Sequence, residues 1–169
     1  MKVLRFYSSK REPKIQSMEN WMQDEKRKHY RPWKESRGPI KAGGFTVALA
    51  RSINDVLVAP IAILPQVEGD IVRPFKVGIG REIKARLRTD IPGVRLNRAL
   101  HFYTRSQAYL FATAQPDAMR HDIDGNPVEP VSEQDRIDAR RRFHAHRCRK
   151  QRQDEQKSCE ADGEAAAEN

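Results

Sequence analysis

The sequence has few of the features that mark membrane or secreted proteins. It contains two cysteines in 169 residues, Cys148 and Cys159, which indicates no disulfide framework and suits a reducing cytosol. No run of about 18 apolar residues occurs, so we expect neither a membrane-spanning helix nor a membrane partner. The charged N-terminus lacks the apolar stretch of a secretory signal, and we therefore expect a cytoplasmic protein.

Motifs for catalysis and for cofactor binding are also missing. There is no Walker A motif, no GxGxxG, no HExxH and no CxxC. Four possible zinc ligands lie at a spacing that matches no standard site: His144, His146, Cys148 and Cys159. A tight turn explains the polar cluster His121, Asp122 and Asp124 more simply than acid–base chemistry does. We therefore expect no enzyme activity, no cofactor and no metal.

Positive charge is plentiful but unevenly distributed. Lys and Arg number 32 against 23 Asp and Glu, which gives a net charge of +9. Residues 1–43 and residues 136–153 each carry +7, residues 44–135 are neutral, and residues 154–169 carry −5. An excess of this kind indicates an anionic partner, with nucleic acid the leading candidate.

Arg120 is isolated within an acidic stretch. Residues 73–105 hold nine basic and two acidic residues, whereas residues 106–135 hold six acidic residues and Arg120 alone. The simplest interpretation is an exposed ion pair with Asp122 or Asp124, worth roughly 0–1 kcal/mol.

The length allows one domain of roughly 100 residues with tails. We predict a basic, flexible N-terminal arm at residues 1–43, a folded domain at 44–145 and a charged, disordered C-terminal tail at 146–169. The arm interleaves Trp21 and Trp33 with cations, a pattern that suits stacking on nucleic acid. The alternative is that its tryptophans fold back onto the domain.

Hydrophobic spacing and turn residues predict helices separated by loops, with one β-hairpin. A hairpin is predicted around Asp124-Gly125, and Ile61 to Val67 is read as a loop or an edge strand. Helices are predicted from Phe45 to before Pro60, from near Gly80, over Leu96–Tyr103, through Tyr109–Thr113 with Thr104 or Ser106 as cap, and from Ser132 with Asp135 as the capping-box acid.

Five motifs in fixed order carry a resemblance to a known family. They are Arg73-Pro-Phe-Lys-Val-Gly-Ile79, Leu96-Asn-Arg-Ala-Leu100, Tyr103-Thr-Arg-Ser106, Tyr109-Leu110, and Arg120 through Asp124-Gly125-Asn126. Over about residues 70–135 the chain resembles the ProQ/FinO family of bacterial RNA chaperones. The resemblance implies an α+β, mainly helical domain of about five helices with small β-hairpins. It also implies a monomer that binds a terminator-like RNA hairpin by its single-stranded 3′ end, in a concave pocket.

The matching positions supply candidate RNA-binding residues. Tyr109 is expected to stack on or hydrogen-bond a terminal nucleotide, and Arg120 to hold a positive charge beside it. Thr104, Arg105 and Ser106 are expected to meet a phosphate at a helix start. Alternatively, Tyr109 is a core residue and Ser106 only a helix cap.

A second group of basic residues is expected to contact duplex RNA. Lys76, Arg95 and Arg98 would meet its phosphates, with Arg73 in the same RNA-binding set, or they form a solvated helix face. The sequence departs from the family's basic pattern at three positions: Gly93, Asn97 and His101.

The main hypothesis is therefore an RNA chaperone that protects small or antisense RNAs and promotes RNA–RNA pairing in post-transcriptional regulation. The alternative is a sequence-independent DNA-binding, nucleoid-type protein that uses its basic flanks. A small enzyme acting on an acidic or nucleotide substrate is a third possibility, which the missing catalytic motifs disfavour.

Overall fold

The chain divides into two units, residues 1–31 and 32–169. The computed structural model describes residues 31–167, with side chains to residue 151, and the following account concerns the second unit. Most of the predicted basic arm, including Trp21, lies outside the described residues.

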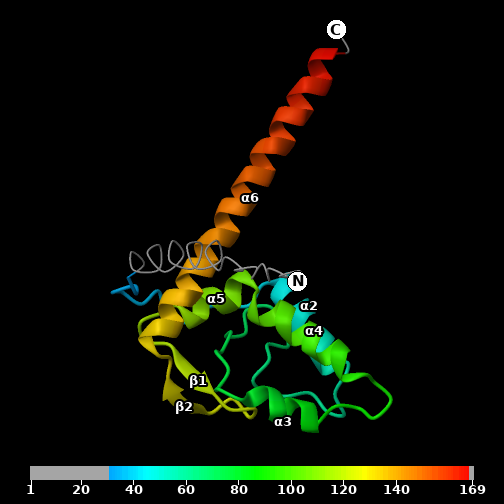
Figure 1. The fold of residues 1–169 in the computed structure, drawn as a ribbon, viewed down its shortest axis with the longest axis vertical. Coiled ribbons are helices and arrows are strands. Elements are labelled where there is room, and N and C mark those ends of the chain that lie inside the picture. The colour runs from blue at the N-terminus through cyan, green and yellow to red at the C-terminus, as the bar shows by residue number, and fades with distance from the viewer. Residues whose placement is uncertain (1–30, 168–169) are drawn as a thin grey trace, which may run out of the picture. The chain divides into compact units, whose positions relative to one another are not determined.

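The described part of the chain contains five helices and a two-stranded antiparallel sheet, which confirms the mainly helical α+β prediction (Figure 1). In chain order the elements are α2 (Gly44–Asn54), α3 (Ile79–Ala85), α4 (Gly93–Thr104), α5 (Gln107–Thr113), β1 (Met119–His121), β2 (Pro127–Pro130) and α6 (Glu133–Ala167).

Helix α2 ends earlier than Pro60 alone would require. Its buried face carries Val47, Ala50 and Ile53 at helical spacing. The chain leaves the helix at Asn54, whose side-chain carbonyl accepts the Ile61 N–H at 3.2 Å. This bond closes the following loop and turns residues 61–64 into the core.

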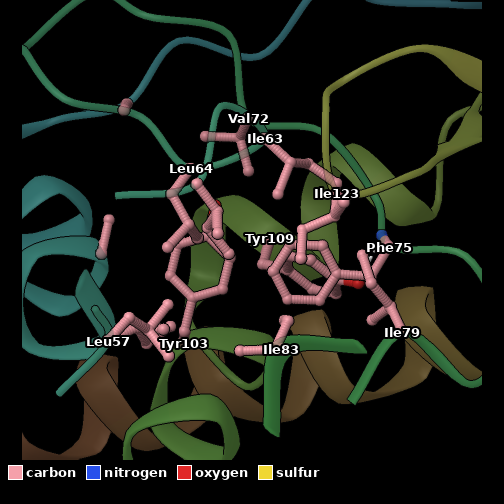
Figure 2. Close-up of a cluster of buried hydrophobic side chains, with 14 of the residues drawn as sticks. Leu57, Ile63, Leu64, Val72, Phe75, Ile79, Ile83, Tyr103, Tyr109 and Ile123 are labelled. Atoms are coloured by element: carbon pink, nitrogen blue, oxygen red, sulfur yellow. Dashed lines mark hydrogen bonds between the residues drawn. The ribbon is translucent and has the colours of Figure 1, made fainter. Parts of the chain in front are cut away.

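One apolar core joins the helices to the loops between them. Its largest fully buried side chains are those of Tyr103, Ile53, Ile61, Ile63, Ile83 and Leu96. Figure 2 shows aromatic rings of this cluster next to side chains from the loop at 61–64. The segment 61–67, for which a loop or an edge strand is predicted, is thus a loop whose first part is buried, through Ile61, Ile63 and Leu64.

The hairpin forms at the predicted turn. Gly125 has φ +88°, a conformation that favours glycine, and the Asp122 carboxylate accepts the N–H groups of Asp124 and Asn126 at 3.0 and 2.9 Å. The bond from Asn126 is the main cause that lowers the pKa of Asp122. The strand pairing then places Arg120 opposite Glu129.

Residues 32–43 pack against the domain, although their composition predicts part of a flexible arm. The Trp33 ring lies edge-on to Phe111 and Phe143, with centroid distances of 5.1 and 5.9 Å. Further along, the Val72 N–H donates to the Ile40 carbonyl at 2.8 Å. For Trp33 the fold-back alternative is correct, since one tryptophan buries enough apolar area to dock a short segment.

We expect Trp33→Ala to lower the free energy of unfolding by about 2 kcal/mol, less than the ~3–5 kcal/mol typical of a fully buried tryptophan. Urea denaturation followed by circular dichroism measures this loss. Lys34→Ala, at the adjacent exposed position, is the control. Equal stability of the two variants would show that the segment is not anchored by its aromatic ring.

Helix α6 begins as predicted and runs further than predicted. The Ser132 hydroxyl accepts the Asp135 N–H at 3.2 Å, the geometry of a helix cap. The helix packs on α5 and continues to Ala167, past residue 146, where the sequence predicts a charged C-terminal tail to begin. Residues 146–167 contain no proline and are rich in strong helix formers, which favours continuation. No helix in the described part of the chain is long and apolar enough to cross a membrane.

Candidate functional site

The backbone of Phe75 connects two of the predicted site residues. The Tyr109 hydroxyl accepts the Phe75 N–H at 2.9 Å, and Arg120 Nη1 donates to the Phe75 carbonyl at 2.9 Å. Reciprocal backbone bonds of 2.9 and 2.8 Å tie Lys76 and Pro74 to His121. Helix α5 and strand β1 are therefore fixed against the same extended segment, and Tyr109 and Arg120 come together there.

Arg120 is paired, but not with the partners expected from the sequence. Its Nη2 lies 2.8 Å from the Asp135 carboxylate, and its Nε lies 3.8 Å from Glu129. The predicted pairing with Asp122 or Asp124 is wrong, because strand register brings Glu129 across and the start of α6 brings Asp135. Only 14% of the Arg120 side chain is exposed. Its bonds to Asp135 and to the Phe75 carbonyl use two of its five N–H donors.

A cavity of about 370 Å³ opens beside this arginine. Its wall combines the α4–α5 junction, strand β1 and the first turns of α6. Four predicted residues line it together: Thr104, Arg105, Tyr109 and Arg120.

Four further ionisable residues on the wall were not predicted as site residues: His101, Asp135, Asp138 and Arg142. Three of them belong to α6, where Asp135, Asp138 and Arg142 follow the i, i+3, i+7 spacing of one helix face. The capping signal at Ser132 fixes the start of this helix. Helical spacing counted onward from Ser132 predicts that these three residues share one face, and this signal was present in the sequence.

The cavity brings cations and carboxylates close together. Arg105 and Arg142 are exposed and able to bind a phosphate. Asp135 faces Arg120, and Asp138 lies 3.2 Å from Arg141. An ionised carboxylate only accepts hydrogen bonds, so it suits a hydroxyl donor. The site is therefore chemically matched to a phosphate with a neighbouring sugar hydroxyl.

Tyr109 forms part of the core as well as of the cavity wall. It is 9% exposed, and its ring packs at 5.4 Å from Phe75 and 5.5 Å from Tyr103. Burial raises the pKa of Tyr109 to about 12, against the opposing effects of the Phe75 N–H and Arg120. The hydroxyl thus stays protonated near neutral pH and keeps one hydrogen to donate.

Tyr103 is a core residue, with 0% exposure. Burial raises its pKa as well, and its hydroxyl has no hydrogen-bond partner among the described residues. The two tyrosines are therefore neighbours with opposite hydrogen-bonding states.

This contrast predicts opposite effects of two matched substitutions. Tyr109→Phe strands the buried Phe75 N–H, which is expected to lower the free energy of unfolding by about 1–3 kcal/mol. Tyr103→Phe removes an unsatisfied hydroxyl and is expected to be neutral or slightly stabilising. Urea denaturation of both variants gives the comparison. A larger loss for Tyr103→Phe would contradict the hydrogen-bond assignment.

The remaining predicted residues do not line this cavity. Ser106 is buried and its hydroxyl accepts the Tyr109 N–H at 3.3 Å, as its helix-cap alternative expects. Lys76 forms an ion pair with Glu82 at 2.6 Å, which is the main cause that raises the pKa of Lys76.

The predicted arginines are also distributed over other surfaces. Arg73 lines a separate cavity of about 310 Å³ that reaches residues 38–40. Arg95 and Arg98 are exposed on α4, and the Arg98 guanidinium lies 5.6 Å from the Phe102 ring centroid. The structure therefore brings four of the predicted residues together at the cavity, whereas Arg95 and Arg98 lie exposed on α4 and Arg73, Lys76 and Ser106 lie at other positions.

Comparison with known proteins agrees with the motif pattern. The model of the ProQ/FINO family matches residues 50–158, more than half of the chain. Among solved structures, the chain is similar to a ProQ homolog from Legionella pneumophila studied in solution by NMR. The identity is 28%, the match covers 66% of this chain and 91% of that one, and the TM-score is 0.43. On the strength of the family match, this chain belongs to the ProQ/FinO family of RNA chaperones.

Proposed function

We propose that this protein binds structured RNA by its 3′ end and that the cavity beside Arg120 receives the terminal nucleotide. The RNA is a terminator-like hairpin followed by a short single-stranded tail. Through this contact the protein protects small or antisense RNAs and promotes RNA–RNA pairing. The observation that carries the proposal is the position of Arg120 on the wall of a cavity of about 370 Å³. Its side chain is only 14% exposed and is held by the Phe75 carbonyl, Glu129 and Asp135.

The charges of the cavity favour a free 3′-hydroxyl. Arg105 and Arg142 are placed to bind the last internucleotide phosphate, and Arg120 to donate to the terminal ribose. Asp135 supplies an acceptor for a ribose hydroxyl. A 3′-phosphate would instead place added negative charge against Asp135 and Asp138, and like charges repel strongly in a partly buried site.

Helix α4 supplies a surface for the adjoining duplex. Its exposed cations Arg95 and Arg98 belong to the same helix as His101 and Thr104 on the cavity wall. Contacts to phosphates in A-form RNA read shape rather than sequence. A duplex along α4 with its 3′ tail entering the cavity fits both groups of residues.

The test compares one hairpin RNA with a free 3′-hydroxyl and the same RNA with a 3′-phosphate. We expect the 3′-phosphate to weaken binding by tenfold or more in a fluorescence anisotropy titration. Duplex DNA of equal length serves as competitor in the same assay. Equal affinity for both RNA ends would contradict the proposal, and competition by DNA as effective as by hairpin RNA would favour the nucleoid-type alternative.

A further inference from the structure

A second, larger cavity adjoins the one beside Arg120. Its volume is about 890 Å³, and it lies between the start of α2, the α4–α5 junction and residues 146–150 of α6. Phe45 and Phe102 on its wall are 73% and 49% exposed. Leu49, Phe111 and Phe143 add further apolar surface. Exposed aromatic rings of this kind are costly in water and mark a contact surface.

The rim of this cavity is basic. Arg105 and three residues of α6, Arg147, Arg149 and Lys150, line it. None of the described residues along it is acidic, in contrast to the cavity that contains Asp135 and Asp138. Aromatic faces surrounded by cations are the combination that proteins use to bind single-stranded nucleic acid.

The two cavities share part of their walls. His101 and Arg105 line both of them, and a small cavity that includes Arg105, Arg142 and Arg149 lies alongside. The two cavities are therefore adjacent, with Arg105 on the wall of each.

We propose that the aromatic cavity is a second RNA subsite, which binds the single-stranded tail just upstream of the terminal nucleotide. Bases stack on Phe45 and Phe102, and their phosphates contact the basic rim. Stacking of this kind tolerates any base, so we expect the affinity to depend on the length of the tail rather than on its sequence. The inference rests on the proposed function, because it requires the 3′ end to be bound next to it.

The volume and charge favour RNA over a protein segment. A cavity of 890 Å³ is within the range that holds small ligands, which leaves room for more than one base. Its uniformly basic rim complements a phosphate backbone and offers no carboxylate to basic side chains of a protein partner.

The experiment uses two hairpins that differ only in the tail, of about three or about eight nucleotides. The unsubstituted protein is expected to bind the longer tail on the order of tenfold more tightly. In the double variant Phe45→Ala/Phe102→Ala this gain should disappear, while affinity for the short tail stays within about twofold. Val58→Ala/Val77→Ala, at two exposed apolar positions elsewhere, is the control that should retain the gain.

Several outcomes would overturn the inference. One is equal binding of the two tails by the unsubstituted protein, and another is a gain that survives in the double phenylalanine variant. A free single-stranded RNA that binds the complex with the short-tail hairpin, and is lost in the double variant, would assign the cavity to a second strand. Comparing short-tail hairpins with a 3′-hydroxyl and a 3′-phosphate tests the proposed function separately. The binding of these RNAs does not depend on the extra affinity that a longer tail provides.

Discussion

Arg120→Ala is expected to weaken binding of a hairpin RNA with a free 3′-hydroxyl by on the order of 100-fold. Truncating a desolvated, hydrogen-bonded charged residue at an interface costs about 2–5 kcal/mol in other complexes, and the Arg120 side chain is only 14% exposed. Here the substitution removes the donor at the cavity wall and leaves the Asp135 carboxylate without its cation. The remaining negative charge then repels the RNA backbone, which adds to the loss.

The same substitution also affects folding, so affinity and stability are measured separately. Loss of the bond to the Phe75 carbonyl is expected to lower the free energy of unfolding by about 1–3 kcal/mol. Binding is therefore measured at a temperature where circular dichroism shows the variant folded. Arg88→Ala, an exposed arginine paired with Asp90, is the control. Similar losses of affinity in both variants would show that Arg120 is not part of the RNA-binding site.

Arg105→Glu is expected to weaken RNA binding by a similar factor without affecting the fold. Arg105 is exposed and lines both cavities, so its reversal replaces an attraction with a repulsion along the whole path of the tail. Exposed substitutions of this kind change stability by no more than about 0.5 kcal/mol. Because screening weakens exposed charges, the loss should shrink as the salt concentration rises.

The matched control for Arg105 is the same reversal at Arg51. This residue is exposed at the end of α2 and is not part of either cavity wall. Arg51→Glu changes the net charge equally. It should therefore lower the RNA affinity only through the long-range electrostatic effect, by a few-fold at low salt. Equal losses in the two variants would show that total charge, and not the cavity, determines affinity.

Local signals in the sequence were sufficient for most of the secondary structure. Asp124-Gly125 predicted the hairpin, and Ser132 with Asp135 predicted the start of α6, because turn and cap chemistry depends on neighbouring residues. The juxtaposition of Tyr109 and Arg120 followed from the family resemblance. Local sequence does not predict this contact, because Tyr109 and Arg120 are joined through hydrogen bonds to the backbone of Phe75, which is distant in the sequence.

The parts that were not predicted depend on contacts between distant segments. Arg120 is paired with Glu129 and Asp135 because strand register and helix position bring those carboxylates across, whereas the sequence suggested nearer ones. Likewise, Trp33 packs against Phe143, more than a hundred residues away. Composition around Trp33 indicated an arm, because it contains no information about a distant docking surface.

One thermodynamic cycle tests most directly whether the 3′-terminal nucleotide lies beside Arg120. It combines the unsubstituted protein and Arg120→Ala with hairpins that end in a 3′-hydroxyl or a 3′-phosphate. If the end enters the cavity, Arg120→Ala is costly only for the 3′-hydroxyl RNA, because the 3′-phosphate is already excluded. The two changes should then be strongly non-additive, with a coupling above about 1 kcal/mol. Additive effects, with the same loss of affinity for both RNA ends, would show that the 3′-terminal nucleotide does not lie beside Arg120.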